Sequence, residues 1–157
     1  MAADLDTFWA LIDDMAVCMM TTRDGAALHS RPMVADIDKS THEFRFLTKL
    51  SSHKIDALAA NPAVNLAFCD AQRCIFVSVS GQAYLTQDRT LIDAIWRSGA
   101  ARYFDGARDD PDTAVIRVVP ATAEHWNSDR SLQQSWTVFK PRNAELKPAM
   151  DPEVAFS

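Results

Sequence analysis

The sequence predicts a mainly β (α+β) protein, a small β-barrel of about six antiparallel strands with peripheral helices. Two observations lead to this prediction. Most apolar segments alternate with a period of two residues, and several follow one another through short turn-forming stretches, as in hairpins. The helical segments are few and do not alternate regularly with the strands, which argues against a doubly wound parallel sheet.

Two helices are expected in the first half of the chain. Residues 4–15 carry apolar side chains at helical spacing from Phe8 onward, behind acidic residues that suit the positive end of a helix. A second, short helix follows Ser51 or Ser52, either of which can cap its first turn, and it ends at an Asn-Pro pair. Both helices are expected to place one apolar face on the sheet.

Three strands are expected between these helices. Short-period apolar character predicts strands over residues 16–22 and 28–38, and the Asp-Gly pair between them is typical of a hairpin turn. Residues 43–48 alternate like a third strand. We therefore expect the first two strands to pair antiparallel.

The second half of the chain continues with two strands and a helix. Strands are predicted over residues 63–69 and 74–86, and Gly81 inside the longer one indicates a bulge or bend. Asp88 is expected to cap a third helix and Gly99 to end it. Its inward-facing residues are expected to be Leu91, Ile92, Ile95 and Trp96.

A last strand is expected over residues 114–119, after a polar loop. Beyond Asn127 the sequence is rich in proline and has one apolar patch, at residues 136–139, so we expect an irregular segment. The domain prediction is a single unit over residues 1–157, with the barrel and its helices in residues 1–126 and a divergent C-terminal tail in residues 127–157.

Charge and composition exclude several classes of protein. The chain has 157 residues, and 16 Lys and Arg against 21 Asp and Glu give a net charge of −5, which opposes binding to nucleic acids. No stretch approaches the about 18 apolar residues of a membrane helix, and acids stand where a signal peptide carries bases. We therefore expect a cytoplasmic protein with no nucleic-acid or membrane partner.

Cysteine and histidine usage points away from metal binding. Cys18, Cys69 and Cys74 form an odd number among apolar residues, which indicates reduced thiols buried in the core. No nearby Cys-His cluster completes the four ligands of a zinc site, and the histidines show no spacing typical of a metal triad. No metal is expected, and no side chain is assigned a catalytic role.

A candidate anion site arises from two segments. Arg31 shares a strand face with apolar residues, so a partly buried guanidinium would need an anion there. The run KLSSHK then places Ser52, His53 and Lys54 at a helix start, where backbone N–H groups also face an anion. Arg31 and Lys54 together would balance the charge of a phosphomonoester. Alternatively, Arg31 pairs with a structural carboxylate or snorkels at the barrel rim. The helix start, with His53, would then simply face solvent.

Longer runs resemble a known family. They are TTRDGAALHSRPM, FRFLTKLSSHKIDALAANPAVNLAF and FVSVSGQAYLTQDR. Together they resemble the pyridoxamine 5'-phosphate oxidase-like superfamily of FMN-binding split barrels, and within it the general stress protein subgroup. The resemblance extends from about Trp9 to Trp126. It implies that the fold is a split β-barrel.

The resemblance also implies FMN as the cofactor. Arg31, Ser52 and Lys54 would hold its phosphate, and Trp126 stands where the subgroup has an aromatic residue at the end of its last barrel strand. The loop at residues 103–107 corresponds to an aromatic loop of the subgroup, although a Pro and a Gly of that loop are replaced here. The residues expected to line the isoalloxazine ring are Pro32, Met33, Val34, Leu47 and Thr48.

Two functional hypotheses follow from this resemblance. The first is a flavin-dependent oxidoreductase, related to pyridoxamine 5'-phosphate oxidase and linked to stress response, with an unknown small-molecule electron donor or acceptor. The second is a non-catalytic protein that binds or senses flavin. A barrel that binds haem or a deazaflavin is a third reading, and the lack of a second phosphate site in the sequence disfavours vitamin oxidation.

The resemblance further implies a homodimer, because members of the superfamily form their flavin sites between two barrels. Several aromatic residues fall in loops or at element ends, where a partner could cover them. They are Trp96, Tyr103, Phe104 and Trp126.

Overall fold

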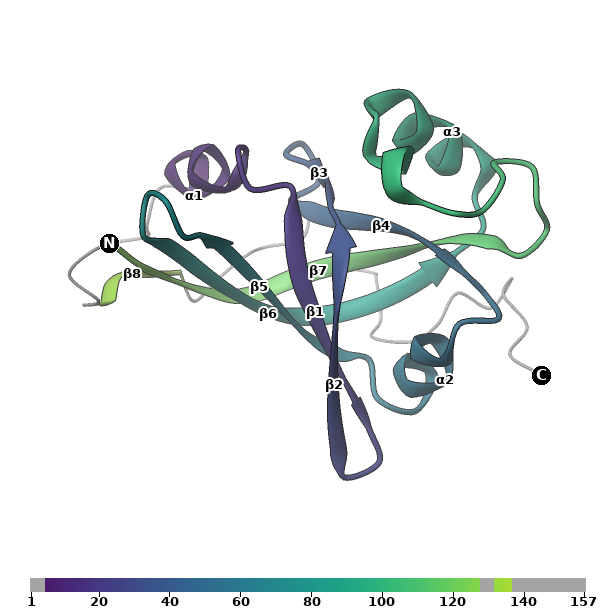
Figure 1. Cartoon of the computed structure of the whole chain (residues 1–157), viewed down its shortest axis with the longest axis horizontal. Helices are drawn as coiled ribbons and strands as arrows, with labels where there is room; N and C mark the ends of the chain where they lie inside the picture. Colours follow the sequence, from purple (N-terminus) through teal and green to yellow (C-terminus); the bar gives the residue numbers. More distant parts are fainter. Residues whose placement is uncertain (1–4, 128–131, 137–157) are drawn as a thin grey trace.

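An antiparallel sheet of eight strands forms most of the molecule (Figure 1). The computed structural model describes residues 5–127 and 132–136, and the side chains of residues 6–127. The elements are α1 (Leu5–Ile12), β1 (Val17–Asp24), β2 (Ala27–Val34), β3 (Asp36–Asp38), β4 (Glu43–Lys49), α2 (His53–Ala60), β5 (Ala63–Asp70), β6 (Ile75–Thr86), α3 (Arg89–Ser98), the 3-10 helix η1 (Ala100–Tyr103), β7 (Thr113–Trp126) and β8 (Leu132–Trp136).

The strand order shows how the sheet closes. It runs β2-β1-β5-β6-β7-β4-β3, with β8 paired to β7. Strands β2 and β3 are separated along the chain by Ala35 alone, yet they lie at opposite ends of this order. The sheet must therefore curve until its two edges meet, as in a barrel. The predicted fold class, a mainly β split barrel with peripheral helices, is confirmed.

The expected single strand over residues 28–38 is wrong. The chain leaves the β1–β2 hairpin at Ala35, whose N–H donates to the carbonyl of Ala16 at 2.8 Å. The next residues form β3, which pairs with β4 and not with β1. Alternation continues through both strands, so the sequence pattern does not reveal that the hydrogen-bonding partner changes.

The last barrel strand is longer than the expected 114–119. Strand β7 continues past Pro120, which lacks an N–H for the ladder, because Pro120 stands opposite Gly81. The register shifts between Ser80 and Gly81, so the predicted bulge is confirmed. A Cβ on Gly81 would lie 2.9 Å from the Cα of Pro120 and closer still to the carbonyl oxygen of Val119. This close approach of two backbones requires glycine.

Two apolar clusters hold the helices on the sheet. In the barrel interior, Phe8 of α1 packs edge-to-face on Phe44 of β4, with ring centroids 6.4 Å apart. In the second cluster, Ile92 and Ile95 of α3 pack on strands β4 and β7. Asp88 caps α3 by accepting from the Thr90 N–H at 2.9 Å, and Gly99 ends it with a φ of 87°, so both caps are confirmed.

Strand β8 lies in the segment that was expected to be irregular. It pairs antiparallel with the end of β7, opposite residues 123–126. Residues 137–139 of the expected apolar patch lie outside the described part of the chain. Within residues 5–127 and 132–136, no helix is long and apolar enough to cross a membrane.

Candidate functional site

A pocket of about 550 Å³ lies between the end of β2, the end of β4, the start of α2 and the η1 segment. This volume is within the range of about 300–1,000 Å³ that is typical of cofactor and small-molecule sites. Most of the residues expected to contact flavin line it, namely Pro32, Met33, Val34, Leu47, Thr48, Ser52 and Lys54.

Arg31 stands next to this pocket on β2. Its Nη1 donates to the Thr22 hydroxyl at 2.8 Å and to the Met20 carbonyl oxygen at 3.3 Å. Both acceptors are neutral, and burial lowers the pKa of Arg31 from its ordinary value. The expected alternative, a structural carboxylate paired with Arg31, is not found among the described residues.

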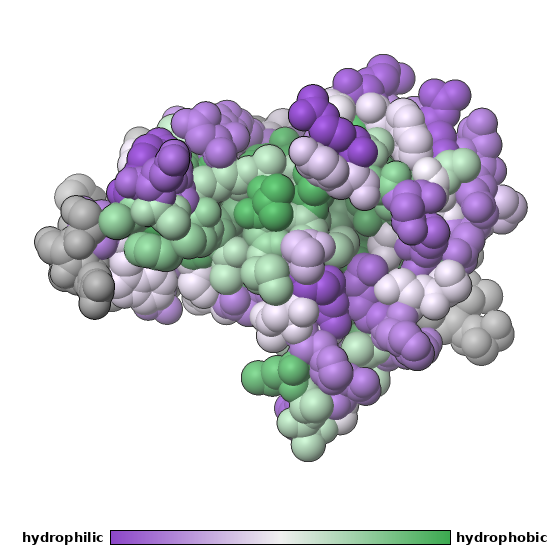
Figure 2. All heavy atoms as spheres, viewed as in Figure 1, coloured by the Kyte–Doolittle hydropathy of each residue, from purple (hydrophilic) through white to green (hydrophobic). Residues whose placement is uncertain are grey.

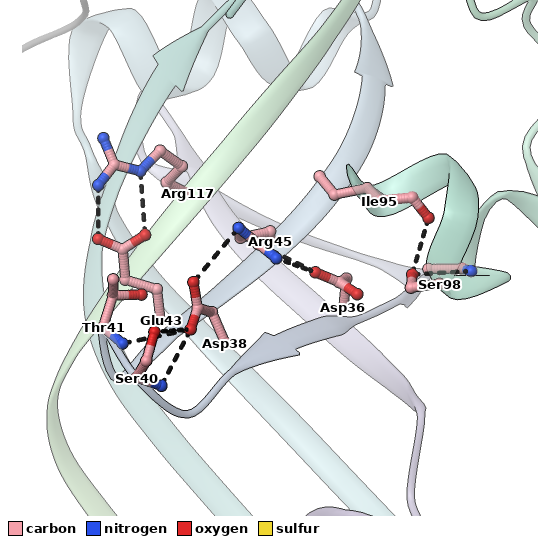
Figure 3. Close-up of polar contacts among 10 residues, drawn as sticks. Asp36, Asp38, Ser40, Thr41, Glu43, Arg45, Ile95, Ser98 and Arg117 are labelled. Atoms are coloured by element: carbon pink, nitrogen blue, oxygen red, sulfur yellow. Dashed lines mark hydrogen bonds and ion pairs between the residues drawn. The ribbon is translucent and has the colours of Figure 1, made fainter. Parts of the chain in front are cut away.

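The other partly buried arginines of the sheet, Arg45 and Arg117, have carboxylate partners (Figure 3). Arg45 donates through Nε and Nη2 to Asp36 at 2.9 and 2.7 Å, and its Nη1 lies 3.4 Å from Asp38. Arg117 makes a bidentate contact with Glu43, at 3.0 and 2.6 Å. Because these guanidinium groups are neutralised within the protein, Arg31 differs from them in having neutral partners only.

Lys54 is a second positively charged side chain beside the pocket, and the charge of Arg31 acts on it. The pKa of Lys54 is lowered first by burial and then by the charge of Arg31, while Asp105 partly offsets these effects. Two cations thus lie near enough to repel one another, in a region partly shielded from water. A bound anion would relieve this repulsion and compensate both charges.

The start of α2 departs from the predicted capping. Ser52 occupies the N-cap position, but its hydroxyl makes no capping hydrogen bond. It accepts instead from Lys54 Nζ at 2.8 Å. The Ser51 hydroxyl, the other expected cap, donates to Asp112 at 2.6 Å. The first N–H groups of the helix therefore receive no side-chain cap from either serine.

Thr48 presents a further unsatisfied group to the pocket. The residue is only 2% exposed, and its hydroxyl oxygen has no hydrogen-bond partner among the described residues. An unpaired buried hydroxyl is costly, whereas a ligand atom in the pocket could satisfy it.

Three predicted site residues lie outside the pocket lining, and one of them is Arg31, which precedes the lining residue Pro32 on β2. His53 is exposed on the first turn of α2. Trp126 pairs with Phe76 at the end of β7, whereas the start of β7 pairs with the end of β4 beside the pocket. Because β7 has 14 residues, Trp126 is separated from the pocket of its own chain by nearly the whole strand.

Several residues that line the pocket were not among the site residues expected from the sequence. Tyr103 and Asp105 belong to the loop that resembles the subgroup's aromatic loop, which was the available signal. Val17 is half exposed at the start of β1, and nothing in its sequence context marks it as a site residue. The full set of additional lining residues is Val17, Lys49, Ala100, Tyr103, Phe104 and Asp105.

The cysteines differ from the expected buried set. Cys18 is buried, and burial raises the pKa of its thiol to about 12. Cys69 and Cys74 are free and exposed, so that prediction is wrong for both. Cys69 faces outward on β5, and Cys74 lies in the following turn with a positive φ of 53°. The side chains of residues 6–127 contain no group of three or more potential ligands arranged for a metal ion.

Comparisons with known proteins agree with the fold. The family model described as "Pyridoxamine 5'-phosphate oxidase like" matches residues 3–147. Protein bli-3 of Neurospora crassa is 31% identical over 125 residues, which is 73% of this chain and 60% of that protein. General stress protein 26 of Bacillus subtilis is 29% identical over 113 residues, which is 70% of this chain and 79% of the relative. This chain thus spans less than two thirds of the Neurospora protein.

Solved structures show the same architecture. The general stress FMN/FAD binding protein of Xanthomonas citri superposes with a TM-score of 0.67 and 25% identity, covering 86% of this chain and 96% of that one. A Clostridium acetobutylicum protein related to general stress protein 26 gives a TM-score of 0.71 at 18% identity, with coverages of 85% and 94%. At that identity, the second likeness concerns the fold alone.

Proposed function

The chain belongs to the pyridoxamine 5'-phosphate oxidase-like family, and we propose that it binds FMN in the pocket between β2, β4 and α2. The observation that carries the proposal is the pair Arg31 and Lys54, two partly buried cations beside one cavity, of which Arg31 has only neutral partners. A phosphomonoester brings about two negative charges at neutral pH, which would balance this pair. The FMN/FAD binding of the Xanthomonas relative supports the same ligand class.

The remaining lining residues suit the rest of the ligand. Val34 and Leu47 offer apolar surface to a planar ring, and the Thr48 hydroxyl offers a hydrogen bond to a polar ring or ribityl atom. Backbone groups at the ends of β2 and β4 can orient the ring and tune its electronics. When bound, FMN would supply hydride or single-electron transfer, so the chain itself needs to bind, orient and shield.

We propose further that two copies of the chain assemble around this pocket. Val17 and Met19 of β1 are 51% and 42% exposed, and Phe76 of β6 is 38% exposed. Figure 2 shows hydrophobic residues gathered on this face of the molecule. Val17 also lines the pocket, so the cavity opens onto the same surface. A second copy would cover the apolar face and could bring its own Trp126 towards the flavin.

Spectroscopy and anaerobic kinetics test the function. The purified protein is expected to bind FMN with a flavin absorption spectrum, and a nicotinamide or other small reductant is expected to bleach it in the absence of oxygen. Steady-state transfer of those electrons to a small acceptor would support an oxidoreductase. Tight flavin binding without turnover for any donor and acceptor pair would assign a binding or sensing role, and a haem or deazaflavin spectrum would refute FMN. A monomer in sedimentation at micromolar concentration with flavin bound would contradict the dimer.

A further inference from the structure

Asp105 places a carboxylate at the rim of the proposed phosphate site. Its Oδ1 lies 3.2 Å from Lys49 Nζ, and both side chains line the pocket. The Asp105 side chain is 84% exposed, whereas that of Lys49 is 37% exposed. Among the described residues that line this pocket, Asp105 supplies the carboxylate.

The fold holds Asp105 in this position by packing on both sides of it. Phe104 packs edge-to-face on Trp96 of α3, with ring centroids 6.0 Å apart. A Cβ on Gly106 would lie 2.6 Å from the Phe104 ring, so the backbone after Asp105 folds tightly back over that ring. The carbonyl of Ala107 then accepts from the Thr113 hydroxyl at 2.7 Å. An exposed ion pair alone would be too weak to fix the loop in this way.

The charges around the site are therefore set by four side chains. Arg31, Lys54 and Lys49 are positive, and Asp105 is negative. Asp105 is paired with Lys49 and also acts on Lys54, where its influence opposes that of Arg31. The summed charge of the four is close to the two positive charges that a phosphomonoester dianion requires.

We propose that Asp105 sets the charge selectivity of the anion site, by holding Lys49 in an ion pair so that Arg31 and Lys54 alone act on the ligand's phosphate. The inference rests on the proposed binding of FMN. Without the carboxylate, Lys49 would add a third positive charge to the field at the phosphate. The site would then bind FMN more tightly, at the expense of discrimination between anions.

Charge-changing variants at the rim test this role. Asp105→Asn is expected to tighten FMN binding about three- to tenfold, because one charge acting on a dianion across several ångströms of partly hydrated space has an effect of this order. Lys49→Ala is expected to weaken FMN binding by a similar factor, since it leaves Asp105 unpaired. The double variant is expected to bind FMN within about twofold of the wild type. All these differences should shrink in high salt.

Controls separate the effect of Asp105 and Lys49 on FMN binding from the effects of surface charge in general and of misfolding. Asp109→Asn removes another exposed carboxylate of the same loop, paired with Arg89 at 2.9 Å and absent from the pocket lining, and it is expected to change FMN binding by less than about twofold. Riboflavin, which lacks the phosphate, should bind the wild type and all four variants about equally. Circular dichroism and thermal melting verify that each variant folds.

Each outcome of these titrations is decisive. If Asp105→Asn leaves FMN affinity unchanged or weakens it, or if the double variant stays as tight as Asp105→Asn, the role of Asp105 is refuted. A wild type that binds FMN no better than riboflavin, with a ratio unaffected by Lys54→Ala, would instead refute the phosphate site itself. The two failures are therefore distinguishable.

Discussion

Removing the charge of Lys54 is the most direct perturbation of the proposed phosphate site. Lys54 lies in the first turn of α2 and donates one hydrogen bond to Ser52 at 2.8 Å. An ammonium group has three N–H donors, and no other protein acceptor for Lys54 is found among the described residues. Lys54→Ala therefore removes donors that a phosphate could use, and it leaves the barrel strands untouched.

The expected loss of FMN affinity in Lys54→Ala follows from the strength of hydrogen bonds between charged groups. A hydrogen bond to a charged group contributes about 1.5–3 kcal/mol, so losing one corresponds to roughly ten- to hundredfold weaker FMN binding. Riboflavin has the same ring and no phosphate, so its affinity should change by less than about twofold. Arg31→Ala is expected to give the same pattern, although loss of its contacts with Thr22 and Met20 requires a separate check of folding.

Flavin fluorescence titration of the apoprotein with both ligands measures these effects. Lys39→Ala is the matched control, because Lys39 is an exposed lysine that pairs with Asp13 and does not line the flavin pocket. Equal losses for FMN and riboflavin in Lys54→Ala would refute the reasoning. That result would mean that Lys54 supports the pocket structurally and does not contact phosphate.

The affinity of the same site for FMN should also depend on pH. The pKa of Lys54 is lowered in the free protein, and a bound phosphate would raise it, so protonation and FMN binding favour each other. FMN affinity should then be greatest between the second pKa of the phosphate, about 6, and the pKa of Lys54 in the free protein, and it should fall as the pH rises through the latter. Lys54→Arg keeps its charge at alkaline pH and should bind FMN with a flatter pH profile. An unchanged profile in Lys54→Arg would assign the titration to another group.

Three further substitutions test the pocket and the barrel. Thr48→Val removes the unpartnered hydroxyl, so it should weaken FMN and riboflavin alike by about three- to tenfold without lowering the melting temperature; a loss confined to FMN would contradict this role. Gly81→Ala should destabilise the fold by about 2–3 kcal/mol in urea unfolding, because its Cβ meets the β7 backbone, whereas exposed Gln82→Ala should change it by less than about 0.5 kcal/mol. Glu43→Gln should cost about 2–4 kcal/mol by leaving Arg117 uncompensated, and an unchanged urea midpoint would show that the buried pair contributes nothing.

Features that depend on neighbouring residues could be predicted from the sequence. The Asp-Gly turn joins β1 and β2, and Gly25 adopts the positive φ of 60° that such a turn favours. Asp88 and Gly99 bound α3 because capping needs only the adjacent backbone. The helix start indicated Lys54 and strand alternation indicated Arg31 as an anion-binding pair. The other lining residues that were expected, on β2 and β4, were implied only by the resemblance to the family.

Features that depend on distant parts of the chain could not be predicted in this way. Strand β3 continues the alternation of β2, and only the closure of the sheet pairs it with β4. Strand β7 continues through Pro120 because a bulge in β6 lies opposite it. The approach of Asp105 to Lys49 likewise depends on how the loop after η1 packs against α3 and β4. Contacts between such separate segments have no signature in the local sequence.

Several energetically unfavourable features occur together beside this pocket. The Ser52 hydroxyl accepts a hydrogen bond from Lys54, and α2 lacks the side-chain cap that would contribute about 0.5–2 kcal/mol. Thr48 keeps a buried hydroxyl without a partner, and Arg31 and Lys54 are close enough to repel one another. Arg45 and Arg117, the other partly buried arginines of the sheet, are paired with carboxylates. Buried side-chain atoms without a hydrogen-bond partner among the described residues also occur away from this pocket, at Thr41, His42 and His125, so the assignment depends on the two cations and the uncapped helix start beside one cavity. Losing Lys54 should therefore impair ligand binding and leave folding intact.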